Sequence, residues 1–431
     1  MKKKGILALI LALALCIGLL AGCGGNGSNG GSKNNSDVIK IGYVNPTTGA
    51  LAGNGEGVDW LIKEIETYVN DNLGGIEVDG AKKKIDVIVY DSKSDTNTCG
   101  EMAQKLCEED KVDLMVAIQT PETVNPVSAV AERYGVPCVA IQAPVDAVAA
   151  NRDKYEWTFH AFWTIDKVYE QYRALWTAAG YAPGSGAKIG IAFANDADGT
   201  AWYNVFKERI EEDGYVLVDP GQYPSGTTDF TSYVSQYKQA GIDILSGTNI
   251  PPDFLNLFNE VIKQGVEVGC VTMGKCCLLE GDVGALGNEL AEGIMTEVWW
   301  APTNPYTSAL TGMSCSALGE KYSKDNGGRA MPQPAGYGYA ALELAVEAFQ
   351  KAGTTDKAKV RDALGQMDTT TIVGPIKYDQ TMGGLTYGDT VIGGGQWQMV
   401  DGKLTLIVID NTVYPEVPTT GSYVAGNATQ K

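Results

Sequence analysis

The chain has 431 residues, of which 44% are hydrophobic, and its formal net charge is -19 at pH 7. This length exceeds what one ordinary hydrophobic core covers and predicts two lobes. The acidic balance argues against nucleic acid and anionic lipid headgroups as direct partners of the folded part.

The first segment of the chain is typical of an export signal. Lysines at residues 2–4 precede an apolar run over residues 6–21, which is too short for a membrane span of about 20 apolar residues. The sequence LAG at residues 20–22 stands directly before Cys23 and resembles the lipobox of bacterial lipoproteins. We therefore predict a lipoprotein signal peptide over residues 1–22, and the resemblance implies a lipid on Cys23.

A predicted flexible linker follows the predicted lipid site. Residues 24–36 contain no large apolar side chain and are rich in Gly, Ser and Asn. Because such a segment cannot bury apolar surface, we expect residues 23–37 to form a lipidated Cys and a flexible linker. The predicted location is the cell membrane, with the folded body on its extracytoplasmic face and anchored through lipid.

Strand and helix patterns alternate from residue 38 onward. The first series predicts strands and helices over residues 38–44, 58–69, 84–91, 101–110, 112–119, 126–135 and 136–142. This alternation indicates a parallel sheet with helices on both of its faces.

The alternation restarts after an aromatic stretch at residues 155–181, which we interpret as helical. The second series predicts strands and helices over residues 187–195, 201–213, 214–219, 227–241, 241–248, 252–265 and 268–274. A later helix over residues 337–353 has Gly353 as its expected stop, and residues 394–400 and 403–410 are expected to form a hairpin. The predicted fold class is α/β, with two Rossmann-like lobes.

The sequence contains none of the common catalytic signatures. Its one histidine is His160, and neither a nucleophile elbow, a Walker loop nor a C-x-x-C pair occurs. A calcium site at Asp196 and Asp198 is disfavoured against a polar loop at a strand end. We expect the seven cysteines after Cys23 to behave as small hydrophobic residues. Cys138, for example, lies in a predicted buried strand. We therefore predict no catalytic residue, no cofactor and no metal, and we expect the protein to capture a small molecule.

In open parallel sheets, ligands bind at the carboxyl ends of the strands. Two such sheets facing each other would place their loops on both walls of one cleft. The loops expected to line it are residues 47–55, 119–123, 142–145, 195–199, 248–253 and 274–278.

Several stretches carry a family resemblance through their order and spacing. They include IGYVNPTTGALAGNGEG at 41–57, PVSAVAERYGVPCVA at 126–140, LGNELAEGIM at 286–295 and YGYAALELAVEAF at 337–349. From residue 38 to about 400, the chain resembles type I periplasmic solute-binding proteins of ABC importers, in the leucine/isoleucine/valine-binding branch.

This resemblance implies two lobes joined by a three-segment hinge, with a ligand cleft that closes between them. We place the crossings near Phe159, Trp299 and Tyr378. Lobe 1 would comprise residues 38–158 and 299–378. Lobe 2 would comprise 159–298 and 379–417, and residues 418–431 would form a C-terminal tail.

The resemblance also implies the residues that bind the ligand. In lobe 1 they are Asn54, Thr120, Glu122, Thr123, Gln142 and Ala143. In lobe 2 the corresponding positions of the family fall at Asp198 and Ile250, in place of aromatic residues, and at Cys276. Trp163 is a further candidate, because its ring could stack on a ligand.

Several of these assignments have a structural alternative. Thr120 and Thr123 could instead cap a helix, Gln142 could end a strand, and Trp163 could pack between the lobes. The acid that holds a ligand ammonium in the family falls at Cys276. The loss of that acid removes a charge-assisted bond worth about 1.5–3 kcal/mol, and Asp198 is its candidate replacement.

The predicted function is the substrate-binding subunit of an ABC importer for an amino acid or a related small carboxylate. Its partners would be the small ligand, the permease and ATPase subunits, and the membrane through lipid on Cys23, with no nucleic acid. We expect a monomer. The alternatives are a binder of aromatic acids or small amides, a ligand-sensing lipoprotein and, least favoured, an enzyme.

Overall fold

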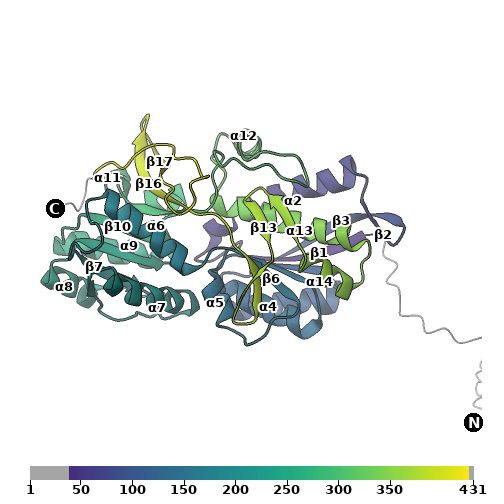
Figure 1. The fold of residues 1–431 in the computed structure, drawn as a ribbon, viewed down its shortest axis with the longest axis horizontal. Coiled ribbons are helices and arrows are strands. Elements are labelled where there is room, and N and C mark those ends of the chain that lie inside the picture. The colour runs from purple at the N-terminus through teal and green to yellow at the C-terminus, as the bar shows by residue number, and fades with distance from the viewer. Residues whose placement is uncertain (1–37, 427–431) are drawn as a thin grey trace, which may run out of the picture. The chain divides into compact units, whose positions relative to one another are not determined.

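A computed structural model describes residues 38–426 (Figure 1). The predicted signal peptide, Cys23 and the linker lie outside the described residues, as does the end of the predicted tail, 427–431. No helix within the described range is long and apolar enough to cross a membrane.

Lobe 1 is built on an eight-stranded sheet with the order β14-β15-β6-β5-β4-β1-β3-β2. Neighbouring strands from β15 to β3 pair in parallel, whereas the edge strands β2 and β14 pair antiparallel. The strands are β1 Val38–Asn45, β2 Ile76–Val78, β3 Ala81–Asp91, β4 Leu114–Ala117, β5 Cys138–Ile141, β6 Thr158–Ala161, β14 Gln380–Met382 and β15 Leu385–Gly388.

Helices cover both faces of this sheet. They are η1 Ala52–Gly55, α2 Val58–Thr67, η2 Tyr68–Asn72, α3 Thr96–Lys105, η3 Leu106–Asp110, α4 Pro121–Tyr134, α5 Val145–Ala149, α12 Cys315–Asp325, α13 Gln333–Ala352 and α14 Lys357–Leu364. The predicted stop of α13 is confirmed, because Gly353 adopts the left-handed conformation with φ 61°. The small hairpin β12 Asp368–Thr371 and β13 Gly374–Lys377 packs beside this group.

Lobe 2 is built on a seven-stranded sheet with the order β17-β16-β11-β10-β9-β7-β8. Its strands are β7 Lys188–Phe193, β8 Val216–Val218, β9 Ile244–Asn249, β10 Cys270–Lys275, β11 Met295–Val298, β16 Gly393–Val400 and β17 Lys403–Asp410. The predicted hairpin is confirmed by the antiparallel pairing of β16 with β17. Its helices are α6 Ile165–Ala178, α7 Ala197–Glu212, α8 Thr231–Ala240, α9 Pro251–Gln264, α10 Glu280–Gly284 and α11 Asn288–Ala291.

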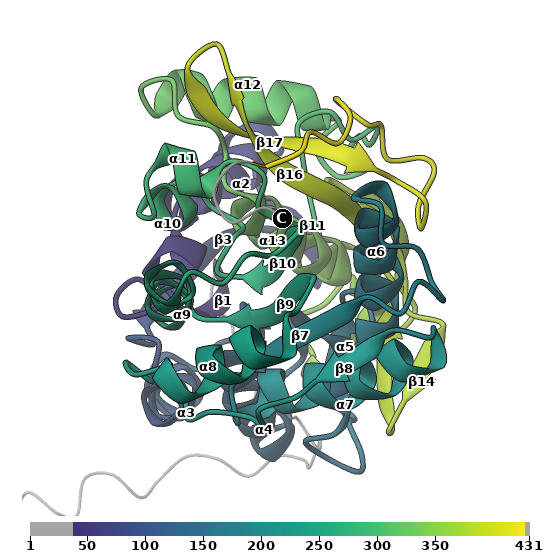
Figure 2. The ribbon, with the colours of Figure 1, turned by 90° about the vertical axis from the view of Figure 1, so that its left-hand side faces the viewer.

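Alternate residues of the lobe 2 strands pack into different cores. Ile191 and Ile244 join the core that contains residues of α6 and α7, whereas their neighbours Ala192 and Leu245 join the core beneath α8 and α9. Figure 2 shows these helix pairs on opposite sides of the strands. This alternation follows from the two-residue period of a strand and makes the sheet apolar on both faces.

The chain passes from one large sheet to the other after β6, after β11 and after β15. The expected crossings near Phe159 and Tyr378 lie too early, because β6 pairs with β5 and β15 pairs with β6 in lobe 1. The helix expected over residues 155–181 is also corrected. Its first part forms β6, Thr158–Ala161, and α6 begins only at Ile165.

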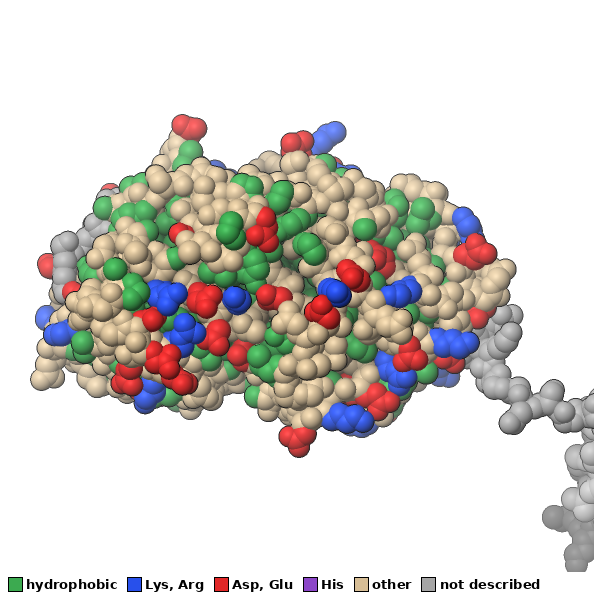
Figure 3. Space-filling view, viewed as in Figure 1, with side chains coloured by type: hydrophobic (Ala, Val, Ile, Leu, Met, Phe, Trp, Pro, Cys, Tyr) green, Lys and Arg blue, Asp and Glu red, His purple; other side chains and the backbone are tan. Residues whose placement is uncertain are grey.

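The excess of acidic residues is not gathered into one patch on the face shown in Figure 3. Red and blue side chains are interspersed there. Ion pairs at the surface of the protein include Lys167 with Glu170 and Arg329 with Glu56. Such pairs contribute little stability, about 0–1 kcal/mol each.

One acidic side chain lies inside the core of lobe 1. Glu343 of α13 is fully buried, and its Oε2 accepts the N–H of Ile372 at 2.9 Å. Burial raises the pKa of Glu343 to about 8, although its hydrogen bonds oppose the shift. The folded state therefore holds this proton more tightly than the unfolded chain does, so stability decreases as the pH rises from about 4.5 to about 8.

We expect a Glu343→Gln variant to lose this part of the pH dependence. Its free energy of unfolding at pH 8 should exceed that of the unaltered protein by roughly 1–3 kcal/mol, with a smaller difference at pH 5. Urea unfolding at both pH values measures the effect. The exposed substitution Glu101→Gln is the control, and stability curves that run parallel for all three proteins would contradict the expectation.

Candidate functional site

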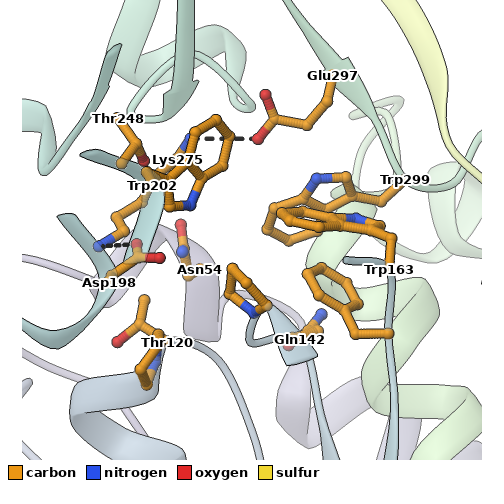
Figure 4. Close-up of a pocket in the computed structure, with 13 residues that line it drawn as sticks. Asn54, Thr120, Gln142, Trp163, Asp198, Trp202, Thr248, Lys275, Glu297 and Trp299 are labelled. Carbon is orange, nitrogen blue, oxygen red and sulfur yellow. Dashed lines mark hydrogen bonds and ion pairs between the residues drawn. The ribbon is translucent and has the colours of Figure 1, made fainter. Parts of the chain in front are cut away.

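A pocket lies between the two lobes, at the carboxyl ends of the strands. The empty space at this pocket, including the part that is open to solvent, is about 310 Å³. Both sheets and two of the crossings contribute to it (Figure 4). The lining residues are Asn54, Thr120, Pro121, Gln142, Pro144, Phe162, Trp163, Asp198, Trp202, Thr248, Lys275, Glu297 and Trp299.

Hydrogen bonds to the backbone fix the wall from lobe 1. Gln142 follows β5 with φ 65°, and its Nε2 donates to the carbonyl of Pro334 at 2.5 Å. Asn54 belongs to η1, and its carbonyl accepts from Nε2 of Gln119 at 2.8 Å. These bonds hold the loops after β1, β4 and β5 in one arrangement at the pocket.

A buried ion pair forms part of the wall from lobe 2. Nζ of Lys275, the last residue of β10, lies 2.5 Å from Oδ2 of Asp198 in the first turn of α7. Only 8% of the Lys275 side chain and 4% of the Asp198 side chain are exposed. Glu122 approaches the same ammonium group, at 3.8 Å.

These charges shift one another's pKa values. Burial raises the pKa of Asp198 to about 7, partly opposed by the Lys275 ammonium, and the negative charge of Glu122 adds to the increase. For Lys275, burial acts against the charged form, but the two carboxylates outweigh it and raise the pKa. Lys275 therefore remains an ammonium at neutral pH, and of Asp198 and Glu122 it is Asp198 that takes up a proton first.

A second buried acid lies on β11. Glu297 is fully buried, and its Oε2 accepts from the Tyr172 hydroxyl at 2.5 Å. Its Oε1 accepts from the N–H of Lys275 at 3.4 Å. Burial raises the pKa of Glu297. The pocket therefore contains one ammonium group and two carboxyl groups, with Glu122 close by.

Aromatic rings form the remaining wall. Trp163 and Phe162 follow β6, Trp299 follows β11, and Trp202 belongs to α7. The rings of Trp163 and Trp202 meet edge to face at 6.0 Å and 89°. Figure 4 shows Trp163 beside Trp299, with Trp202 across the pocket. Such a wall suits an apolar or aromatic part of a ligand.

Polar atoms without partners converge on this pocket. Among residues 38–426, the buried atoms that lack a hydrogen-bond partner include the indole Nε1 of Trp163, Trp202 and Trp299, Oε1 of Gln142, Oγ1 of Thr248 and Oδ1 of Asp198. Buried polar groups are normally hydrogen-bonded, and an unpaired one costs free energy. The pocket therefore offers both donors and acceptors to a bound molecule.

Half of the predicted site residues line the pocket. They are Asn54, Thr120, Gln142, Trp163 and Asp198. The other five are Glu122, Thr123, Ala143, Ile250 and Cys276, and none of these belongs to the lining.

Each of these five residues has another place in the structure. The Thr123 hydroxyl accepts the N–H of Thr120 and donates to the carbonyl of Ile118, so it secures the start of α4. The Ala143 carbonyl is bonded to Nε2 of His160 at 2.6 Å. Ile250 is the N-cap of α9.

Cys276 is buried with its Sγ 3.6 Å from that of Cys277. Glu122 bonds to the N–H of Asp198. These placements keep all five residues out of the observed lining.

Several lining residues were missed by the sequence analysis, above all Lys275, Glu297, Trp202 and Thr248. Lys275 directly precedes Cys276, the position that the family resemblance suggested. Lys275 ends β10 with φ 62°, and Cys276 follows it in a turn and packs into the core. An error of one residue therefore exchanges a pocket side chain for a core side chain. A charged residue at the end of an otherwise apolar strand, GCVTMGK, was the available signal.

A family model described as periplasmic binding protein matches residues 38–388. The chain belongs to this family. Its members are extracytoplasmic proteins that bind small molecules and work with ABC transporters, so the resemblance inferred from the sequence is confirmed.

Known relatives and solved structures agree with this membership. Leu/Ile/Val-binding protein homolog 8 of Brucella melitensis is 23% identical over 392 residues, which cover 88% of this chain and 91% of the relative. A leucine-binding protein, LivK, of Thermotoga maritima has a TM-score of 0.70 at 17% identity and covers 87% of this chain and 99% of its own.

A solute-binding protein of an ABC transporter from Rhodopseudomonas palustris, in complex with 3,4-dihydroxybenzoic acid, has a TM-score of 0.68. It is 22% identical, and the match covers 90% of this chain and 99% of that one. These neighbours have the same fold of two lobes with sheets and helices. Its membership of the periplasmic binding protein family makes this chain a substrate-binding protein of the ABC transporter type.

Proposed function

We propose that this protein is the lipid-anchored substrate-binding subunit of an ABC importer that captures an amino acid or a related small carboxylate. The observation that supports the ligand class is the set of unpartnered donors and acceptors in one pocket. A ligand carboxylate would accept from the Lys275 ammonium and from indole N–H groups. A ligand amine or hydroxyl would donate to Oδ1 of Asp198 and Oε1 of Gln142.

The lobes would close around the ligand and present it to a permease, because a ligand held from both lobes stabilises the closed state. The leucine-binding relative named above supports an amino acid. The lipid on Cys23 rests on the sequence at residues 20–23 alone.

An aromatic acid is the second candidate ligand. The aromatic wall of Phe162, Trp163, Trp202 and Trp299 favours it, since aromatic rings pack edge to face and offset against one another. The Rhodopseudomonas palustris neighbour was solved with 3,4-dihydroxybenzoic acid. Both candidates require the same cation for the ligand carboxylate, namely Lys275.

We expect the purified protein without residues 1–23 to gain thermal stability from one of these compounds. A ligand at 100 times its Kd adds about 2.7 kcal/mol to the free energy of unfolding. A melting screen over the standard amino acids, hydroxybenzoates and small amides measures this gain. Intrinsic fluorescence is a second readout, because three tryptophans line the pocket.

The same screen separates the two candidate ligands. Stabilisation by amino acids alone supports the first candidate, and stabilisation by hydroxybenzoates alone supports the second. The protein should first be unfolded and refolded, so that a compound retained from expression cannot mask binding. No shift with any compound of the refolded protein would contradict the proposed ligand classes.

A further inference from the structure

One carboxylate of lobe 1 reaches into lobe 2 beside the pocket. Glu122 lies in the first turn of α4, directly after Pro121. Its Oε1 accepts the backbone N–H of Asp198 at 3.0 Å, and its Oε2 lies 3.8 Å from Nζ of Lys275. Asp198 and Lys275 belong to lobe 2 and line the pocket, whereas Glu122 does not.

The bond to Asp198 completes the start of a helix. The first four N–H groups of an α-helix have no partner within it and carry partial positive charge. In α7, the side chain of Asp196 caps one of them by accepting from the N–H of Gly199 at 2.8 Å. Glu122 satisfies the N–H of Asp198, so a cap of this lobe 2 helix comes from lobe 1.

Separation of the lobes would preserve the ion pair between Lys275 and Asp198 and would break the contacts of Glu122. Lys275 and Asp198 stay together in lobe 2, so their ion pair survives opening. The two contacts of Glu122 cross between the lobes and must break. A hydrogen bond with one ionised partner is about twice as strong as a neutral one, so the bond of the Glu122 carboxylate to the Asp198 N–H favours the closed arrangement. The attraction between Glu122 and the Lys275 ammonium adds to this preference.

We propose that Glu122 is a positioning residue that acts as a latch between the lobes. It holds Asp198 and Lys275 in place for the ligand and stabilises the closed state whether or not a ligand is present. Its effect on ligand affinity rests on the proposed function, but its effect on closure of the empty protein does not. Affinity then depends on Glu122 without a contact between Glu122 and the ligand.

The latch is tested first without a ligand, in the refolded protein. Glu122→Ala removes both contacts, so the radius of gyration from X-ray scattering should increase and acrylamide should quench the pocket tryptophans more strongly. Glu122→Gln keeps an oxygen that can accept from the Asp198 N–H but loses the charge, so an intermediate result is expected. Glu208→Ala changes an exposed acid on α7 and should match the unaltered protein.

The effect on affinity is tested by calorimetry with isoleucine and with 3,4-dihydroxybenzoate. For whichever probe binds the unaltered protein, Glu122→Ala should raise Kd about tenfold, which corresponds to about 1.4 kcal/mol. If both probes bind, the factor should be the same, because the latch acts on closure. If neither binds, the proposed ligand classes are contradicted while scattering and quenching still decide the latch.

Scattering and quenching that are the same for Glu122→Ala and Glu208→Ala would overturn the latch. A loss of affinity for one probe only, without a change in scattering, would also overturn it and make Glu122 a ligand contact. The glutamine side chain of Glu122→Gln has the same shape as the natural glutamate. If the alanine variant does not fold, scattering and quenching of Glu122→Gln therefore decide the test.

Discussion

A Lys275→Met variant is expected to lose about 3–5 kcal/mol of unfolding free energy at pH 7. The Lys275 ammonium lies 2.5 Å from the Asp198 carboxylate, and both side chains are almost fully buried. Removal of the cation leaves Asp198 without its partner, close to Glu122. A buried charge that loses its partner pays its desolvation cost in full. Urea unfolding, followed by circular dichroism, measures the loss.

The pH dependence of this loss identifies its cause. Because burial places the pKa of Asp198 at about 7 even beside Lys275, the acid in the variant can escape its charge by taking up a proton. Without the Lys275 cation the pKa of Asp198 lies above 7, so the loss should increase as the pH rises above about 7 and should be smaller at pH 7 than at pH 9. An equal loss at both pH values would indicate lost packing of the lysine stem instead.

Two further variants control the experiment. Lys263→Met removes an ammonium that lies 2.8 Å from Glu260 at the surface, with 72% of the lysine side chain exposed, and should cost less than about 1 kcal/mol. The double variant Lys275→Met/Asp198→Asn removes both charges and should recover part of the loss. If Lys275→Met lowers the free energy of unfolding no more than Lys263→Met does, the buried ion pair of Lys275 and Asp198 does not stabilise the fold.

A Cys23→Ala variant is expected to lose all fatty-acid attachment. The lipobox resemblance assigns the lipid to this sulfur, and alanine has no thiol that could form a thioether. Each buried methylene of an acyl chain contributes about 0.8 kcal/mol to membrane binding, so attachment decides whether the body stays at the membrane. Labelling of the cells with a radioactive or clickable fatty acid, followed by purification of the protein, measures attachment directly.

Cys16→Ala is the matched control for this experiment. Cys16 lies within the same apolar run, but the residue before it is Leu15, which is too bulky for the lipobox pattern. This variant should retain the label at the level of the unaltered protein. Label that persists in Cys23→Ala, or that disappears in Cys16→Ala, would contradict the assignment of the anchor to Cys23.

The position of the pocket between the lobes was partly predictable. Thr120 and Gln142 follow lobe 1 strands, and Asp198 follows β7 in lobe 2, so all three were expected at the carboxyl ends of the sheets. The structure brings them to one pocket. The aromatic stretch around Phe162 was harder to interpret, because bulky apolar residues suit both strands and helices. The strand β6 formed there because β5 and β15 offer it partners on both sides.

The sequence by itself determined the alternation of strands and helices, the two lobes, and the stop of α13 at Gly353, since these depend on local periodicity and on backbone preferences. It also determined the family, through the order of its motifs. Only the tertiary structure decided that Lys275 and Glu297 face the pocket and that Glu122 contacts lobe 2 instead. The physical reason is that a side chain at a strand end faces a pocket or a core according to how two separate sheets approach each other, which no local pattern records.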